Sequence, residues 1–217
     1  IESGAPWQDV EPSIEFAAKT QPRPVGKSLK DFEVSEAEKA AITLLRANNV
    51  IVSPLAQISN LVKVTFPAGI GYPDEQLLRV LPDISNLHDL DFSGADISDD
   101  DLGYLSSIPH LQRLNLSETD ISDAGLIRLS ELSNLRTLNL YDTNTTDAGM
   151  ENLTSLQQLK LLFLWQTKVT PAGVSSLEER LPLLEVNTGF DGVPENEPTL
   201  VQTTNYMDGK RPPEPQT

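Results

Sequence analysis

The sequence of 217 residues contains no cysteine and has few basic residues and no long apolar run. Without cysteine, the chain cannot form disulfides, thiolate metal sites, a cysteine nucleophile or the C-x-x-C-H attachment of a c-type haem. Its 16 Lys and Arg residues stand against 32 Asp and Glu, a formal net charge of −16. This excess of acid argues against binding to nucleic acid or to an anionic membrane surface, because both require a basic face. No apolar stretch approaches the roughly 20 residues that cross a bilayer, so we expect no membrane span in this chain.

An internal repeat occupies the middle of the sequence. Consecutive copies start 24 residues apart (111 − 87 = 24). A longer copy precedes them from Leu61, and a truncated one follows from Leu183. The shared pattern is L-x-x-L-x-L-x-x-[AT]-x-[IV]-[ST]-D-x-G-L-x-x-L-x-x-L. The four regular copies begin at Leu87, Leu111, Leu135 and Leu159.

Each copy predicts one strand followed by one helix. Apolar residues alternate with period two in the first half, and their spacing lengthens to three and four in the second half. Hydroxyl residues stand where a helix N-cap would accept a backbone N–H, at Ser98, Ser122, Thr146 and Thr170. The next position, favoured for an acid or for proline at a helix start, holds Asp99, Asp123, Asp147 and Pro171. The pattern therefore predicts an α/β solenoid.

The repeat resembles the leucine-rich repeat, in its cysteine-containing-like subtype, over about residues 61–187. The position that this subtype fills with Cys or Asn here holds Ala95, Thr119, Thr143 and Thr167. A buried threonine hydroxyl can still bond the backbone of the turn. The resemblance implies a right-handed solenoid with a parallel sheet on its concave face and helices on its convex face.

Both ends of a solenoid need a cap. We expect residues 34–60 to form a helical amino-terminal cap, because Ser35 and Glu38 have the spacing of a capping box. The proline-rich residues 1–33 predict an extended linker, and residues 188–217 a carboxy-terminal tail able to dock on the last repeat.

A narrower resemblance concerns location. The phrases "LSETDISDAGL", "LNLYDTNTTDAGM" and "LFLWQTKVTPAGV" are similar to carboxy-terminal repeats of membrane-anchored proteins from planctomycete-type bacteria, many of which carry a c-type cytochrome module. The resemblance implies a location outside the cytoplasmic membrane, on the periplasmic side. It also implies attachment to the membrane through a further segment or a partner, and partners in respiratory or cell-envelope complexes. Since the sequence lacks C-x-x-C-H, we expect no cofactor in this chain. Its start at Ile1 leads us to expect a processed form or a piece of a longer polypeptide.

The stretch "LKLLFLWQTKVT", residues 159–170, is apolar on both faces of its predicted strand. Leu159, Leu162 and Leu164 fit the core, so the opposite trio should face the concave side. Two interpretations remain open: residues 188–207 of the same chain cover the trio, or another protein docks there. The candidate partner-binding residues are Arg113, Asn115, Asn139, Tyr141, Leu161, Phe163 and Trp165.

The sequence indicates no catalytic or metal site. The acidic run around Asp99 suits a helix start better than a calcium site, and His88 and His110 have no companion ligands. We therefore expect a non-enzymatic protein–protein interaction module or scaffold. The alternatives are an accessory subunit of a cytochrome c-linked electron-transfer complex and, more weakly supported, a module that binds cell-wall carbohydrate.

Overall fold

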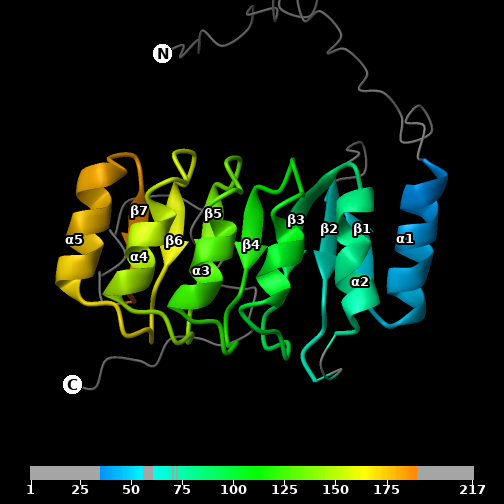
Figure 1. Ribbon diagram of the computed structural model, residues 1–217, viewed down its shortest axis with the longest axis horizontal. Helices are drawn as coiled ribbons and strands as arrows, with labels where there is room; N and C mark the ends of the chain where they lie inside the picture. Colours follow the sequence, from blue (N-terminus) through cyan, green and yellow to red (C-terminus); the bar gives the residue numbers. More distant parts are fainter. Residues whose placement is uncertain (1–34, 56–60, 70, 72, 190–217) are drawn as a thin grey trace, which may run out of the picture.

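The computed structural model describes residues 35–55, 61–69, 71 and 73–189 (Figure 1). The predicted linker 1–33 and most of the predicted tail, 190–217, lie outside these residues. In the described part, seven strands form one sheet in chain order, antiparallel between the first two and parallel thereafter. The strands are β1 (Ile51–Pro54), β2 (Val62–Thr65), β3 (Leu87–Asp91), β4 (Arg113–Asn115), β5 (Thr137–Asn139), β6 (Leu161–Phe163) and β7 (Glu185–Asn187).

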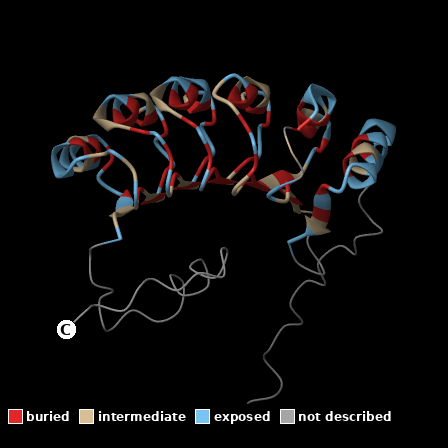
Figure 2. Cartoon of the chain, turned by 90° about the horizontal axis from the view of Figure 1, so that it is seen from below, coloured by how far each residue is buried: buried red, intermediate tan, exposed pale blue. Residues whose placement is uncertain are grey.

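Helical segments lie along one side of this sheet. Figure 2 shows them as an outer arc, the sheet along the inner side of the curve, and the buried residues between the two layers. The arrangement is an open α/β solenoid of leucine-rich-repeat type, which confirms the predicted fold class. The α-helices are α1 (Glu36–Ala47), α2 (Glu75–Arg79), α3 (Asp123–Leu129), α4 (Asp147–Leu153) and α5 (Pro171–Arg180), and the 3-10 helices are η3 (Leu81–Asp83) and η4 (Asp101–Leu105).

Strand pairing follows the 24-residue period. Asp91 pairs with Asn115, Asn115 with Asn139, and Asn139 with Phe163. Side chains at equivalent positions of successive repeats therefore form columns across the sheet, as predicted. The inward column of leucines that includes Leu138 and Leu162 is fully buried. Burying one such side chain is worth about 1.5–3 kcal/mol, so stacked cores hold strands that are only three residues long.

Hydroxyl N-caps are present on three convex helices. The side chains of Ser122, Thr146 and Thr170 accept hydrogen bonds from Ala124 N, Ala148 N and Gly173 N, as predicted. The threonine position after the strand also behaves as predicted, because Thr119 Oγ1, Thr143 Oγ1 and Thr167 Oγ1 donate to backbone carbonyls three residues earlier.

The predicted helix after Ser98 is wrong. A short 3-10 helix, η4, starts at Asp101 instead. Both the N–H and the hydroxyl of Ser98 donate to Asp101 Oδ2, at 2.7 and 2.6 Å. Asp101 stands where the next repeats have glycine, and its carboxylate offers the Ser98 N–H a local hydrogen bond that competes with a regular helix start.

In three successive repeats, the aspartate that follows the N-cap position bonds to the N-cap residue of the next repeat. Asp99 accepts from the N–H and hydroxyl of Ser122 at 2.8 and 2.5 Å. Asp123 accepts from both groups of Thr146 at 2.7 and 2.6 Å. We call these contacts, with the third one from Asp147 to Thr170, the aspartate ladder. The ladder ends at α5, where Pro171 replaces the aspartate.

The glycine of the repeat provides the space for this ladder. A β-carbon added to Gly125, Gly149 or Gly173 would lie 2.4, 2.3 or 2.2 Å from an oxygen of the preceding repeat's aspartate. These glycines have ordinary helical geometry, so the constraint is close approach and not backbone freedom. The aspartate and the glycine of the D-x-G signature therefore act together: the aspartate of one repeat occupies the space left by the glycine of the next.

Candidate partner-binding face

The concave columns place all seven sequence-predicted candidates on one side of the sheet. The candidates on β4 are charged or polar, whereas those on β6 are apolar. The candidates are Arg113 and Asn115 on β4, Asn139 on β5, Leu161 and Phe163 on β6, and Tyr141 and Trp165 two residues beyond the ends of β5 and β6.

The amino-terminal end of the concave face is an internally paired ionic cluster. Lys63 Nζ lies 3.0 Å from Asp91 Oδ2, and Arg113 Nε lies 3.5 Å from Asp89 Oδ2. The Asn115 amide donates to Asp91 Oδ1 at 3.0 Å. Both aspartates are buried. Arg113 thus offsets the charge of Asp89, and Asn115 supplies a hydrogen bond to Asp91, within the same chain. Sequence reasoning placed Asp89 and Asp91 on the same face but did not pair them with these two residues, although the 24-residue spacing already set each opposite its partner.

Burial shifts the titration of one of these aspartates. Desolvation raises the pKa of Asp89 above its ordinary value, and the opposing attraction of Lys63 and Arg113 only partly offsets it. The ionised carboxylate is therefore held at some cost to the fold.

A column of amides supports the turn after each strand. Asn115, Asn139 and Asn187 each accept, through Oδ1, the N–H two residues further along, at 3.1, 3.0 and 2.9 Å. Asp91 accepts from Ser93 in the same way. The equivalent position of β6 holds Phe163, which cannot accept this bond. Asn139, like Asn115, thus has a role within its own repeat, whereas Phe163 departs from the structural pattern.

The carboxy-terminal end of the concave face is apolar and aromatic. Tyr141 and Trp165 stack with ring centroids 5.1 Å apart and an interplanar angle of 29°. Leu161 and Phe163 lie beside them on β6, and all four side chains are half-buried. We call these four residues the aromatic patch. Leu159, Leu162 and Leu164 on the opposite face of the same segment are buried in the core, as predicted.

The chain itself approaches the patch at one edge. A β-carbon added to Gly189 would lie 2.3 Å from Trp165 Cδ1, so the backbone of Gly189 packs against the indole ring. Phe190 and the residues after it lie outside the described residues. Coverage of the patch by residues 188–207 therefore remains a prediction, and so does docking of a partner.

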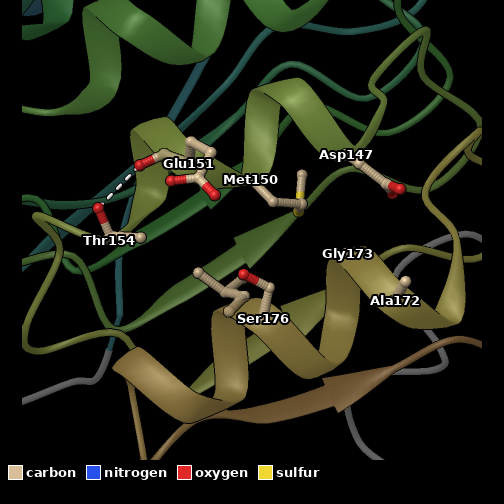
Figure 3. Close-up of a pocket in the computed structure, with 8 residues that line it drawn as sticks. Asp147, Met150, Glu151, Thr154, Ala172, Gly173 and Ser176 are labelled. Atoms are coloured by element: carbon tan, nitrogen blue, oxygen red, sulfur yellow. Dashed lines mark hydrogen bonds between the residues drawn. The ribbon is translucent and has the colours of Figure 1, made fainter.

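A recess lies on the convex side, between α4 and α5 (Figure 3). Its volume is about 240 Å³, and Met150, Gly173 and Ser176 are among the residues that line it. Two of its polar side chains are engaged: Thr154 Oγ1 donates to the carbonyl of Glu151 at 2.8 Å, and the Glu151 carboxylate pairs with Arg180 at 2.6 Å. The recess is therefore a weaker candidate than the concave face.

Other kinds of site find no support in the described part of the chain. No three His, Asp or Glu side chains there are grouped to hold a metal ion. None of its helices combines the length and apolar character needed to cross a membrane.

Among known protein families, the match is to a single repeat of this chain. A family model described as "Leucine Rich repeat" matches residues 107–130, which include β4 and α3. No curated protein matches the chain.

The chain is similar to solved structures of two internalins from Listeria monocytogenes. InlF is 28% identical, with a TM-score of 0.42, and the match covers 51% of this chain and 30% of InlF. InlC2 is 24% identical, with a TM-score of 0.40, and the match covers 50% of this chain and 46% of InlC2. The match to the plant peptide hormone receptor RGFR1, solved with RGF2, is 17% identical, covers 51% and 18% of the two chains and has a TM-score of 0.35. The chain thus spans less than half of the length of each of these proteins.

Proposed function

We propose that this protein is a non-enzymatic interaction module that binds another protein through the aromatic patch. The observation that supports the proposal is the patch itself, at positions where neighbouring repeats carry residues that serve their own fold. Leucine-rich-repeat domains typically mediate protein–protein interaction. The side chains in question are Tyr141, Leu161, Phe163 and Trp165.

The chemistry of the patch suits a binding hot spot. Tyrosine and tryptophan are the commonest anchors of protein interfaces, and they bring large apolar area with few rotatable bonds. Fully burying each of these side chains is worth about 1.5–3 kcal/mol, before the cost of association is subtracted. Since the four are only half-buried in the chain alone, part of this free energy remains for a partner.

A photo-crosslinking experiment tests the proposal. p-Benzoylphenylalanine placed at Phe163 should crosslink one defined partner in native extract. The same probe at Ile127, 56% exposed on convex helix α3, should not crosslink it. A partner captured only from Ile127 would refute the proposed site.

The double substitution Phe163→Ser/Trp165→Ser separates docking from coverage by the tail. We expect it to abolish crosslinking and co-purification of the partner while the circular dichroism of strands and helices stays largely unchanged. Unfolding of the variant would instead show that residues 188–207 complete the fold over the patch.

We further propose that the module works in a larger extracytoplasmic assembly on the periplasmic side, in a respiratory or cell-envelope complex. The support is the similarity of the repeat phrases to those of planctomycete-type fusion proteins. The second candidate is an accessory subunit that positions a c-type cytochrome. An absorbance scan of the native assembly tests it, because a haem partner gives a Soret band that co-purifies with this chain.

Carbohydrate binding is a third candidate, favoured by one observation. The stacked Tyr141–Trp165 pair offers a ring face on which a sugar could pack. Titration of the protein with cell-wall fragments, followed by tryptophan fluorescence, should then saturate in the intact chain and fail after Trp165→Leu.

A further inference from the structure

We propose that the carboxy-terminal end of the solenoid is an interaction site in addition to the aromatic patch, at which an extended basic segment of a partner protein adds as a strand to β7. We call this site the open end. It comprises β7 and the side of α5 that carries Val174 and Glu178. Three features of the described residues support it: core positions that are not fully covered, a free strand edge, and carboxylates without ion pairs.

Core positions that the preceding repeat buries are only partly buried at the open end. Val169, Val174 and Val186 pack against the core but remain half-buried. Figure 1 shows α5 and β7 as the last labelled elements at this end, so no further turn of the solenoid covers these valines within the described residues. Covering them would add hydrophobic stabilisation in proportion to the apolar area removed from water. Their counterparts one repeat earlier, at most 2% exposed, are Thr145, Met150 and Leu162.

The outer edge of β7 offers backbone groups for a further strand. Glu185 N donates to the carbonyl of Lys160 at 2.8 Å, and the Asn187 carbonyl accepts from Leu164 N at 2.9 Å, so both groups point toward β6. Backbone groups of alternate strand residues point to opposite sides. The N–H and carbonyl of Val186 therefore point away from β6, and within the described residues no strand lies beyond β7 to receive them.

The other edge of the sheet is protected. Arg46 Nη2 donates to the Val52 carbonyl on β1 at 3.0 Å, and Pro54 gives that strand a position without an N–H. Helix α1 packs against β1 and lies beyond the sheet at that end (Figure 1). Proline, a bonded cation and a covering helix are the usual means by which proteins prevent strand addition. Since β7 contains no proline and has no covering helix in the described part of the chain, we expect strand addition at β7.

Two carboxylates beside the open end indicate the charge of the partner. Glu178 lies one helical turn after Val174, on the same side of α5. Thr154, its counterpart one repeat earlier, lines the recess that faces α5, so Glu178 faces the position that a further repeat would occupy. Glu185 is exposed on β7. Neither Glu178 nor Glu185 takes part in an ion pair with another described residue.

These charges favour a basic segment over the other occupants. A residue on an added strand would lie directly opposite Glu185, where an opposite charge is favourable and a like charge is not. A second copy of the chain carries a net −16, and residues 190–217 carry two basic and five acidic residues, a net −3 (2 − 5). A further repeat of the same kind fits less well, because Pro171 lacks the carboxylate that would bond its N-cap. The open end thus fits a partner strand with Lys or Arg opposite Glu185 and an apolar residue opposite Val186.

The test uses the full chain and the acetylated, amidated peptide Gly-Lys-Val-Lys-Val-Lys-Gly. Binding is followed by the amide resonance of Val186 in protein labelled with [15N]valine, and a Val186→Ile variant identifies this resonance. Strand addition bonds the Val186 N–H, so we expect its exchange with solvent to slow at least tenfold at saturating peptide. In one control peptide glutamate replaces each lysine, and in the other the three central residues are N-methylated and cannot donate to a strand edge. Each control should bind at least tenfold more weakly.

Two double variants separate recognition at the open end from general attraction. Glu178→Gln/Glu185→Gln removes both carboxylates of the open end, and Glu131→Gln/Glu179→Gln removes two exposed carboxylates outside it. Both variants lose the same net charge. We expect about a fivefold loss of affinity for the lysine peptide in the first variant and less than a twofold loss in the second.

Slow exchange of the Val186 amide before peptide is added would overturn the inference, because the edge would already be occupied. Protection that disappears on dilution would then identify a second copy as the occupant, and protection independent of concentration would identify another part of this chain. Absence of binding at millimolar peptide, equal binding of either control peptide, or equal losses in the two variants would also overturn it. The Phe163 crosslinking experiment tests the aromatic patch separately, so either proposal can fail while the other stands.

Discussion

Replacing Gly149 with alanine tests the aspartate ladder directly. In most helices this change is stabilising, by about 0.5–1 kcal/mol, because alanine loses less backbone entropy than glycine on folding. At this position the added β-carbon would lie 2.3 Å from Asp123 Oδ1 and 2.8 Å from Leu126 Cδ1. The leucine methyl can rotate away, whereas the carboxylate is held by two hydrogen bonds to Thr146. The substitution should therefore push Asp123 off Thr146.

The expected magnitude follows from those two bonds. A hydrogen bond to a charged group is worth about 1.5–3 kcal/mol. Asp123 is half-exposed, so we take about 1 kcal/mol for each bond and 2 kcal/mol for the pair. Subtracting the ordinary gain of alanine leaves a net destabilisation of about 1–1.5 kcal/mol. The sign is thus opposite to the usual effect of this substitution.

Urea unfolding followed by far-UV circular dichroism measures the change. Gly103→Ala is the matched control, because a β-carbon there meets no atom within 4 Å, and it should leave the midpoint unchanged or raise it slightly. In an Asp123→Ala background, Gly149→Ala should become stabilising, because the carboxylate that it displaces is gone. A neutral or stabilising Gly149→Ala in the native background would refute the ladder as a source of stability.

Three further predictions concern strain and pH. Gln166 has φ of 59°, so Gln166→Gly should raise the free energy of unfolding by up to about 1 kcal/mol, whereas Gln166→Val should lower it. Burial raises the pKa of Asp89, so its ionised carboxylate destabilises the folded state at neutral pH. Asp89→Asn should therefore raise the urea midpoint at pH 7. Below about pH 4, where the native carboxyl is also neutral, the substitution should make no difference. The hydroxyl of Thr170, and then its N–H, lower the pKa of Asp147. Asp147→Asn should therefore lower the midpoint at pH 7, and the difference should vanish as acid protonates the native carboxylate, below about pH 4. A pH-independent effect of either aspartate substitution would contradict its assigned cause.

The solenoid was predictable because its signals are periodic. A 24-residue repeat places the same residue types at the same depth in every turn, so strand columns and core leucines follow from the register alone. The N-caps of α3, α4 and α5 followed for the same reason. The boundaries of the cap, linker and tail remain predictions, since residues 1–34 and 190–217 lie outside the described part of the chain.

The failure occurs where one copy departs from the consensus. The helix expected after Ser98 is the short 3-10 helix η4, in the copy where Asp101 replaces the ladder glycine and accepts from both the N–H and the hydroxyl of Ser98. Arg113 and Asn115 remain candidate partner-binding residues, but the sequence alone does not show that Asp89 and Asp91 on the neighbouring strand are buried and bonded to them. Such contacts depend on the local geometry of particular side chains, which a repeat pattern does not encode.

The same comparison of consensus with exception supports the choice of site. On the concave face, the side chain at the last strand position supports the turn in β3, β4, β5 and β7 through an Asp or Asn oxygen. In β6, Phe163 gives up that hydrogen bond and remains half-buried, so the fold gains little from a phenylalanine there. Phe163 thus removes a turn hydrogen bond from its own repeat and leaves apolar surface accessible. Any compensating stabilisation has to come from contacts outside the repeat. Burial against another surface, whether a partner or a further part of this chain, supplies such stabilisation, because the hydrophobic gain grows with the apolar area removed from water.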